Sequence, residues 1–286
     1  KYTYEMKDVA AIAECLSRNR DENGNGKIDL DELKWYLPAT DQLASMFLGA
    51  KSLPSPLFDD RSVSSVTYDD GNNHYITSNK QKIWAEEGCS FGGISSYGSK
   101  NYPKLLRCVR NLGLSNEDAK SRVVSPAYTY NSQNKVFIMD QLTSQNKRTG
   151  KTTGELDFHD NFDDINRPYK AFQMASTFIG GRNTDWYTLF DIGVNHLSKC
   201  KDLTEGGHKW RAPNQREFMI MFLQNTSNVI NNNNRGFTRT HWKYDESRHF
   251  GLNGLLLFLD NNGDYDRTIR CVRDVDVNAN GSIIND

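Results

Sequence analysis

Apolar positions along the chain form two matching series, each of which predicts an amphipathic helix. One series follows the sequence Trp-Tyr-Leu-Pro at 35–38, and the other follows Trp-Arg-Ala-Pro at 210–213. Both place apolar side chains at the same offsets after the proline, a spacing that gathers them on one helical face. The positions are Leu43, Met46 and Phe47 in the first series and Phe218, Met221 and Phe222 in the second.

The two predicted helices begin with different capping signals. Asn214 and Glu217 form a capping-box pattern, which satisfies the free N–H groups at a helix start. The first series has Ala39 and Gln42 at the same two positions, so Thr40 is the alternative cap there.

Other elements repeat in the same order in both halves. A cysteine in a segment with helical spacing comes first, and an alternating Arg-Cys-Val-Arg pattern that predicts a strand comes last. The helical segments are 6–20 with Cys15 and 191–201 with Cys200, and the strands are 106–111 and 269–274. Because three elements match in order, we interpret the chain as an internal duplication.

This duplication predicts a first lobe at 1–113 and a second lobe at 114–286. The polar sequence Gly-Leu-Ser-Asn-Glu-Asp at 113–118 marks the boundary, because it has the composition of a linker or a cap. The second lobe has the longer entry, at 122–199. We expect there a strand at 135–140, a basic loop at 144–153, and helices at 169–179 and 186–197.

Composition narrows the class of protein. The chain has 286 residues and a mean hydropathy of −0.72, with no apolar run long enough to cross a bilayer. Its 35 basic and 36 acidic residues give a net charge of −1, so no overall field attracts nucleic acid or anionic lipid. We expect a soluble, folded protein with no nucleic-acid partner and no direct membrane insertion.

The cysteine positions, the Trp-x-x-Pro helix starts and the Gly- and Asn-rich middle segments resemble the C-type-lectin-like fold. The resemblance implies an α+β fold of two tandem C-type-lectin-like lobes. More narrowly, the segment 15–37, the sequence Asn-Arg-Pro-Tyr-Lys-Ala-Phe at 166–172 and the paired Arg-Cys-Val-Arg strands resemble the C-terminal adhesin region of Bacteroidales fimbrial tip proteins. That family implies extracellular display on the cell surface at the tip of a fimbrium. It also implies a host or bacterial surface glycan or protein as ligand, contact with other fimbrial subunits, and no catalysis.

A pairing of the cysteines accompanies this resemblance. We expect disulfides from Cys15 to Cys108 and from Cys200 to Cys271, with Cys89 left free, so that each staples a lobe's first helix to its last strand. The alternative is five reduced core cysteines, because Cys is often buried without bonding.

The twelve residues from Asp21 to Glu32 fit the EF-hand pattern for calcium. Gly26 occupies the sixth position, where the loop turns sharply, and Ile28 is the apolar residue expected to pack against the core. The predicted Ca²⁺ ligands are Asp21, Asn23, Asn25, Lys27 through its carbonyl, Asp29 directly or through water, and Glu32 through both oxygens. The alternative is a solvated acidic turn.

This loop differs from that of a calcium sensor. No second loop pairs with it, and Pro38 cuts the exiting helix short. We therefore expect a structural Ca²⁺ that pins the Cys15 segment to the Trp35 segment. Two other acidic stretches, at 155–164 and 260–266, are interpreted as a solvated loop and a polar hairpin turn.

Sequence signatures of catalysis are absent. The chain has no Gly-rich phosphate loop, Gly-x-Ser-x-Gly, Cys-x-x-Cys or His-Glu-x-x-His. The sulfatase-activating oxidases resemble C-type lectins and use a close pair of reduced cysteines, but no second reactive cysteine lies at short spacing from Cys89. We expect that the protein is not an enzyme.

The predicted ligand face lies between Gly236 and Asp266, before the last strand. Aromatic and short polar side chains there have the composition of a recognition surface. His241 and His249, separated by aromatic and charged residues, are interpreted as part of this surface rather than as a metal-ligand pair. The predicted contact residues are His241, Trp242, Tyr244, Asp245, His249, Asn253, Asn261, Asn262, Asp264 and Tyr265.

Alternatives to this ligand face stay open. Trp242 and the segment 255–259 also fit a plain lobe core, and the Asn run at 231–234 also fits a hypervariable face of the kind that retroelements diversify. The main competitor to an adhesin is a structural pilus or surface-layer subunit that contacts only its neighbours. Against it, the polar C-terminal segment 278–282, followed by only two isoleucines, is poor material for a donated strand.

Overall fold

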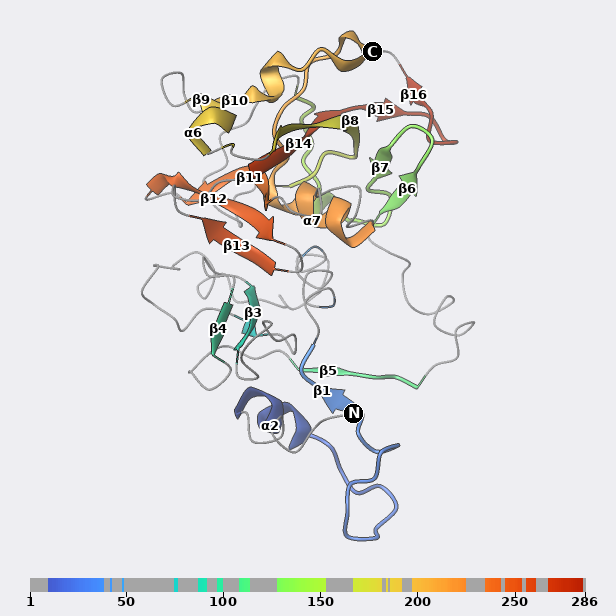
Figure 1. Ribbon diagram of the computed structural model, residues 1–286. Coiled ribbons are helices and arrows are strands. Elements are labelled where there is room, and N and C mark those ends of the chain that lie inside the picture. The colour runs from blue at the N-terminus through green and yellow to red at the C-terminus, as the bar shows by residue number, and fades with distance from the viewer. Residues whose placement is uncertain are drawn as a thin grey trace. The chain divides into compact units, whose positions relative to one another are not determined.

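The computed structural model shows an α+β protein that is mostly sheet with few helices (Figure 1). It divides into two compact units, one formed by 1–46 and 58–124 and the other by 47–57 and 125–286. The predicted division after residue 113 borders a stretch, 114–127, that lies outside the described residues. The structure describes residues 10–38, 42, 48, 75–76, 87–91, 97–99, 108–113, 128–152, 167–181, 184, 186–191, 197–224, 235–242, 245–253, 256–260 and 267–284.

The first unit begins with helix α2 (Ala10–Leu16), which lies within the helical segment predicted at 6–20. A loop then leads to strand β1 (Trp35–Tyr36), which pairs antiparallel with β5 (Val109–Arg110), part of the predicted strand 106–111. The Cys15–Cys108 disulfide joins α2 to the residue just before β5. A separate antiparallel sheet contains β2 (Tyr75–Ile76), β3 (Glu87–Phe91) and β4 (Tyr97–Ser99).

Two predictions for the first unit fall on segments of which the structure describes only some residues. Of the helix expected after Pro38, the described residues include only Gln42 and Leu48, both with helical backbone. Cys89 is described as a backbone position in β3, opposite Tyr97 of β4.

The second unit is built on a seven-stranded sheet with the order β13-β12-β11-β14-β8-β7-β6. All neighbouring strands are antiparallel except β11 and β14, which run parallel. The strands are β6 (Thr129–Asn131), β7 (Val136–Ile138), β8 (Ala171–Gly181), β11 (Arg235–Trp242), β12 (Asp245–Asn253), β13 (Leu256–Asp260) and β14 (Arg267–Asp274). β7 and β14 confirm the strands predicted at 135–140 and 269–274.

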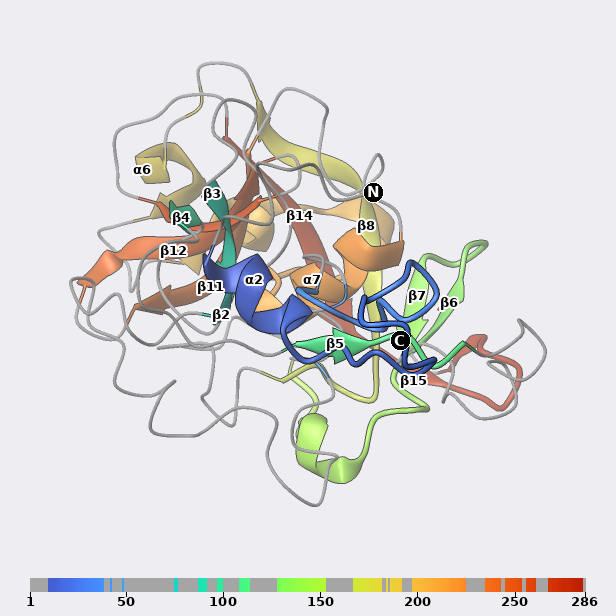
Figure 2. The same cartoon turned by 90° about the horizontal axis from the view of Figure 1, so that it is seen from below.

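Short elements complete this unit. A hairpin of β15 (Asp276–Val277) and β16 (Ile283–Ile284) lies beside β6 and β7 in both views (Figures 1 and 2), where Asn131 donates to the carbonyl of Gly281. Helix α7 (Gln215–Gln224) begins after Pro213, as predicted. The remaining elements are the 3₁₀ turns η3 (Ser144–Asn146), η4 (Lys199–Asp202) and η5 (Glu205–Gly207), helix α6 (Trp186–Leu189), and the paired strands β9 (Phe190–Asp191) and β10 (Leu197–Ser198).

The capping box at the start of α7 is confirmed. The backbone N–H of Glu217 donates to Asn214 Oδ1 at 2.8 Å, and the backbone N–H of Asn214 donates to Glu217 Oε2 at 2.9 Å. Each side chain therefore satisfies an N–H that the helix start leaves open.

The helix predicted at 169–179 is wrong, because this segment forms β8. Its first residues are buried on both faces of the sheet, including Ala171, Phe172, Met174 and Ala175. A strand with both faces covered is apolar without alternation, so periodicity does not distinguish it from a helix. The helix predicted at 186–197 is likewise limited to α6, and Cys200 lies in a 3₁₀ turn rather than in a longer helix.

A bulge in β8 sets the path of the central strands. Three residues of β8 oppose one of β14 between the pairs Phe178–Arg270 and Met174–Val272. The carboxylate of Glu205 accepts the backbone N–H groups of Ser176 and Thr177, and the pKa of Glu205 is lowered because these bonds outweigh its partial burial. The guanidinium of Arg270 donates to the carbonyls of Ala175 and Ser176. The backbone groups that the ladder loses at the bulge are thus satisfied by side chains.

The core of this unit surrounds the Cys200–Cys271 disulfide. The disulfide connects η4 to β14, and the indole N–H of Trp210 donates to the carbonyl of Glu205 at 2.9 Å. The buried cluster contains Ala175, Leu189, Phe190, Cys200, Trp210, Ala212, Ile269 and Cys271. Both disulfides are the pairs expected from the sequence.

The two units share local contacts at the positions that the repeat makes equivalent. Tyr36 pairs with Val109 in the first unit, and Arg211 pairs with Val272 in the second. A guanidinium lies over the repeated tryptophan in each, with Arg110 5.8 Å from the ring centre of Trp35 and Arg273 5.5 Å from that of Trp210. Together with the two disulfides, these contacts support the internal duplication.

The Cys200–Cys271 disulfide should contribute strongly to stability. It closes a loop across a sequence separation of 71 residues, which corresponds to about 4 kcal/mol in the chain-entropy account. We expect the double variant Cys200→Ala, Cys271→Ala to lose stabilisation of about this size in denaturant unfolding of the second unit. The matched variant Cys89→Ala should leave that transition unchanged, and equal losses in the two variants would contradict the assignment.

Candidate functional site

The loop from Asp21 to Glu32 has the backbone turns of the predicted calcium motif. Gly24 and Gly26 have φ values of +73° and +81°, a region that favours glycine. Asp21 accepts the backbone N–H groups of Gly24, Asn25 and Gly26 at 2.7, 3.2 and 2.6 Å. The first carboxylate of the motif therefore organises the turn that follows it.

The other oxygen-bearing side chains of the motif also accept backbone N–H groups. The Oδ1 atoms of Asn23 and Asn25 each accept the backbone N–H two residues further along, at 2.9 Å. Glu32 is buried and accepts the N–H groups of Glu22, Asn23 and Asp29 at 2.8, 3.0 and 2.9 Å. The last carboxylate of the motif thus closes the loop back onto its start.

The carboxylate of Asp29 is hydrogen-bonded to both asparagines of the loop. Its Oδ2 accepts the amide N–H groups of Asn23 and Asn25 at 3.1 and 2.7 Å. No group of three or more His, Cys, Asp or Glu side chains that could hold a metal occurs among the residues described in full. Calcium binding by Asp21, Asn23, Asn25, Lys27, Asp29 and Glu32 stays a prediction.

The expected core contact of Ile28 is not formed in the structure. The side chain of Ile28 is 42% exposed and that of Leu30 is 87% exposed. The loop at 21–32 instead holds its shape through the polar bonds of Asp21, Asp29 and Glu32.

The predicted ligand residues on β11 and β12 lie on adjacent strands. His241 is directly opposite His249, and Trp242 is directly opposite Asp245. Asn253, at the end of β12, is opposite Leu256 of β13. The other predicted contact residues, Tyr244, Asn261, Asn262, Asp264 and Tyr265, lie outside the described residues.

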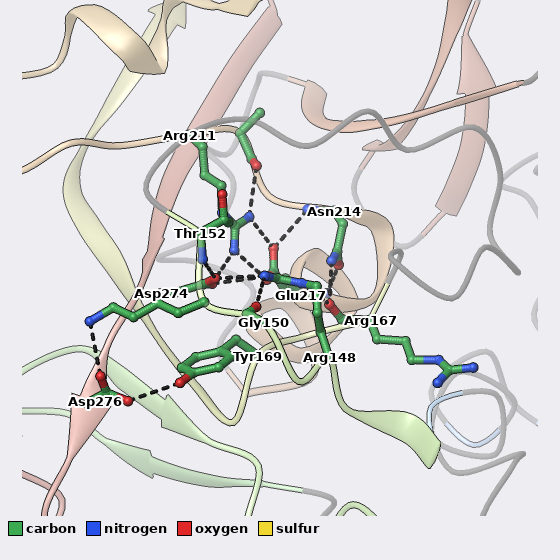
Figure 3. Close-up of polar contacts among 12 residues, drawn as sticks. Arg148, Gly150, Thr152, Arg167, Tyr169, Arg211, Asn214, Glu217, Asp274 and Asp276 are labelled. Carbon is green, nitrogen blue, oxygen red and sulfur yellow. Dashed lines mark hydrogen bonds and ion pairs between the residues drawn. The ribbon is translucent and has the colours of Figure 1, made fainter. Parts of the chain in front are cut away.

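A buried cluster of charges, which the sequence analysis did not predict, joins three parts of the second unit (Figure 3). Arg211 donates to both carboxylate oxygens of Glu217 at 2.7 Å and to Asp274 Oδ1 at 2.5 Å. Arg148 donates to both oxygens of Asp274 at 2.8 and 3.1 Å. We call Arg148, Arg211, Glu217 and Asp274 the buried charge cluster.

The cluster is buried and almost fully paired. The exposed fraction of its four side chains is 8%, 2%, 0% and 0%. Thr152 donates its backbone N–H to Asp274 Oδ2 at 2.9 Å, and Asn214 donates its side-chain amide to the carbonyl of Arg167 at 3.0 Å. Two positive and two negative charges thus meet in a balanced set, as buried charges require.

Burial and the neighbouring charges shift the pKa values of Asp274 and Arg211 in opposite directions. Burial favours the neutral form of Asp274, but Arg211 and Arg148 outweigh it and hold the pKa of Asp274 below its usual value. Burial likewise favours deprotonation of Arg211, but Glu217 and Asp274 raise its pKa. The stabilisation from Asp274 is therefore present above the usual Asp pKa near 3.9 and is lost as pH falls through the lower pKa of the folded state.

A signal for part of this cluster was present in the repeat. The residues equivalent to Arg211 and Glu217 in the first half are Tyr36 and Gln42. They bond to each other too, since the amide of Gln42 donates to the hydroxyl of Tyr36 at 2.8 Å. The sequence alone shows that these two positions change together from a neutral to a charged pair, but Arg148 comes from a loop with no repeat signal.

Comparison with family models, curated proteins and solved structures finds no match to this chain. Within the described residues, no helix is both long enough and apolar enough to span a bilayer.

The buried charge cluster should be essential for folding of the second unit. We expect Glu217→Gln to destabilise this unit by about 3–5 kcal/mol, because it leaves Arg211 buried beside one carboxylate fewer. Urea unfolding followed by circular dichroism measures the change.

A matched control uses an exposed ion pair of the same unit. Lys170 and Asp276 are 58% and 34% exposed and lie 2.8 Å apart. Lys170→Gln should cost about 1 kcal/mol or less. A loss from Glu217→Gln no larger than that from Lys170→Gln would show that the cluster is not a major source of stability.

Proposed function

We propose that this chain is an extracellular adhesin, a fimbrial tip subunit that binds a host or bacterial surface glycan or protein through its second unit. The observation that carries the proposal is the position of the predicted contact residues on neighbouring strands. His241 and Trp242 end β11, and Asp245 and His249 lie opposite them on β12. A hairpin whose sequence contains aromatic and short polar residues has the composition of a recognition surface.

The scaffold behind this hairpin supports a binding role. β11 is hydrogen-bonded to β14, and β14 carries both Cys271 and Asp274. The hairpin is therefore attached to the strand that the disulfide and the buried charge cluster both hold. Binding sites on rigid elements lose less conformational freedom when a ligand binds.

The two disulfides support an extracellular location, because such bonds form and persist in oxidising environments. We further propose that each unit is a C-type-lectin-like lobe. In support, each unit has a cysteine upstream of its Trp-x-x-Pro sequence, and this cysteine is bonded to the closing Arg-Cys-Val-Arg segment of the same unit.

The alternative is a structural pilus subunit that contacts only neighbouring subunits. Such a subunit would be expected to donate a strand to the sheet of its neighbour. In the described C-terminal segment, Ile283 pairs with Val277 in the β15–β16 hairpin. Its side chain packs against the buried cluster of Val136, Ala171 and Val275. This strand is engaged within its own unit, which supports the adhesin over a subunit that donates it.

Binding is tested on an array of glycans and host and bacterial surface proteins. We expect the parent chain to bind a defined ligand and the variant Asp245→Ala, Asn253→Ala to bind it at least about tenfold more weakly, a loss of about 1.4 kcal/mol. The control is Gln133→Ala, Gln145→Ala, which removes two exposed polar side chains of the same unit.

Each outcome of the array separates two alternatives. Equal binding by the folded Asp245→Ala, Asn253→Ala variant would place the ligand face elsewhere. No signal for the parent chain on any ligand would favour the structural subunit.

We also propose that the loop at 21–32 binds a structural Ca²⁺. Its carboxylate and amide oxygens are the ligand type that Ca²⁺ prefers, and its two asparagines limit the negative charge, which suits the ~0.1–1 mM dissociation constants of extracellular modules. Bound Ca²⁺ would replace Asn23 and Asn25 as the partner of Asp29.

Calcium should raise the stability of the first unit by mass action. At 10 mM Ca²⁺ we expect a gain of about 1.5–3 kcal/mol in its unfolding free energy, together with binding heat in calorimetry after chelation. Glu32→Gln should abolish both effects, whereas Glu14→Gln, which changes an exposed helix residue, should preserve them. The absence of heat and of a stability shift in the parent chain would leave the loop as a polar turn.

A further inference from the structure

Two Asn-Gly pairs follow each other in the predicted calcium loop and have the same surroundings. They are Asn23–Gly24 and Asn25–Gly26, and both asparagines are exposed. Asp21 accepts the backbone N–H of Gly24 on one carboxylate oxygen, at 2.7 Å, and that of Gly26 on the other, at 2.6 Å. One carboxylate therefore holds the N–H groups of both glycines.

The side-chain carbonyls of the two asparagines are also bonded alike. Asn23 Oδ1 accepts the backbone N–H of Asn25, and Asn25 Oδ1 accepts that of Lys27, each at 2.9 Å. A donor on a carbonyl oxygen stabilises the negative charge that develops there when a nucleophile attacks the carbon. Each asparagine thus has a polarised carbonyl next to a glycine N–H that is bonded to a carboxylate.

These groups are the reactants of asparagine deamidation. The backbone nitrogen of the following residue attacks the asparagine Cγ, a succinimide ring forms, and the Cγ–Nδ2 bond breaks. The attacking nitrogen loses its proton, and Nδ2 leaves as ammonia. Water then opens the ring, at Cγ to give aspartate or at the backbone carbonyl to give isoaspartate. Glycine is the most permissive following residue, because it has no Cβ to restrict the backbone at the ring.

Open space surrounds both glycines of the loop. A Cβ built on Gly24 or on Gly26 would meet no atom within 4 Å. The ring that closes on either nitrogen therefore has room to form.

A third Asn-Gly pair provides an internal comparison. Asn280 is exposed in the turn between β15 and β16, but Gly281 is buried. The N–H of Gly281 donates to the neutral carbonyl of Asn278 at 2.9 Å, and a Cβ built on Gly281 would lie 3.1 Å from Ile138 Cδ1. This pair has the same two residue types without the carboxylate and without the open space.

We propose that Asn23 and Asn25 are modification sites, which deamidate in the folded protein with the carboxylate of Asp21 as general base. Asp21 takes the glycine proton as the new C–N bond forms and passes it to the departing Nδ2. The N–H of Lys27 stabilises the oxyanion at Asn25, and the N–H of Asn25 does the same at Asn23. Water is the only other reactant.

The products change the charge of the loop. Asp29 Oδ2 accepts the amide N–H groups of Asn23 and Asn25 at 3.1 and 2.7 Å. Deamidation replaces each donor with a carboxylate, so that like charges meet at Asp29. Calcium affinity in such loops rises with the charge of the ligands, so the aspartate product should bind Ca²⁺ more tightly. This consequence rests on the proposed calcium role, whereas the modification itself does not.

The test is peptide-mapping mass spectrometry of the full chain after incubation with a chelator at neutral pH. In the folded chain we expect both loop sites to convert at least about tenfold faster than Asn280. This factor is smaller than that of a well-matched general base, because a carboxylate is a weak base. In denaturant, with the disulfides reduced, all three sites should convert at similar rates, because the contacts that distinguish them are lost.

Two variants of equal charge test the part of Asp21. Asp21→Asn should slow both loop sites about tenfold and leave the rate at Asn280 unchanged. Asp31→Asn, which removes an exposed carboxylate of the same loop, should convert as the parent does. The proposal is overturned if the loop sites of the folded parent convert no faster than Asn280, or if folded Asp21→Asn converts as fast as the parent.

Calorimetric titration with Ca²⁺ separates this proposal from the calcium role. The variant Asn23→Asp, Asn25→Asp should bind Ca²⁺ at least about tenfold more tightly than the freshly purified parent. Rapid deamidation in chains that bind no Ca²⁺ would reject the calcium role and retain the modification sites. Calcium binding by a parent whose loop does not deamidate would do the reverse.

Discussion

The paired charges of Arg211, Glu217 and Asp274 are the constraint on which the second unit depends. Arg211 lies before α7, Glu217 lies in its first turn, and Asp274 ends β14, so one guanidinium fixes a helix start against a central strand (Figure 3). Charges removed from water are costly unless they are paired and hydrogen-bonded. The cluster therefore forms only after the helix, the strand and the loop that carries Arg148 have reached their places.

The first unit meets the same requirement with neutral groups. Tyr36 and Gln42 replace Arg211 and Glu217 and form a single hydrogen bond, and Asn111 stands where the second unit has Asp274. At these three positions the first unit therefore has no buried charge and no desolvation penalty to offset. This unit instead joins its helix to its strands through the side chain of Asn19, which bonds the backbone of Leu16, Lys34 and Trp35, and through the Cys15–Cys108 disulfide.

The proposed binding function lies on the strands next to β14, the strand that the disulfide and the buried charge cluster hold in place. β14 separates the strongly packed strands β8, β7 and β6 from the hairpin strands β11, β12 and β13. The proposed ligand face lies on the hairpin strands.

The sequence by itself determined the local features of this protein. It predicted the capping box at Asn214, the strand around Cys271, the two disulfides through the resemblance, and the turn that requires Gly26, because each depends on nearby residues or on a repeated pattern. The tertiary structure decided the strand identity of β8, the pairing of His241 with His249 and the meeting of Arg148 with Asp274. Those features depend on which face is covered and which strands are neighbours, and such long-range contacts leave no periodic signal in one chain.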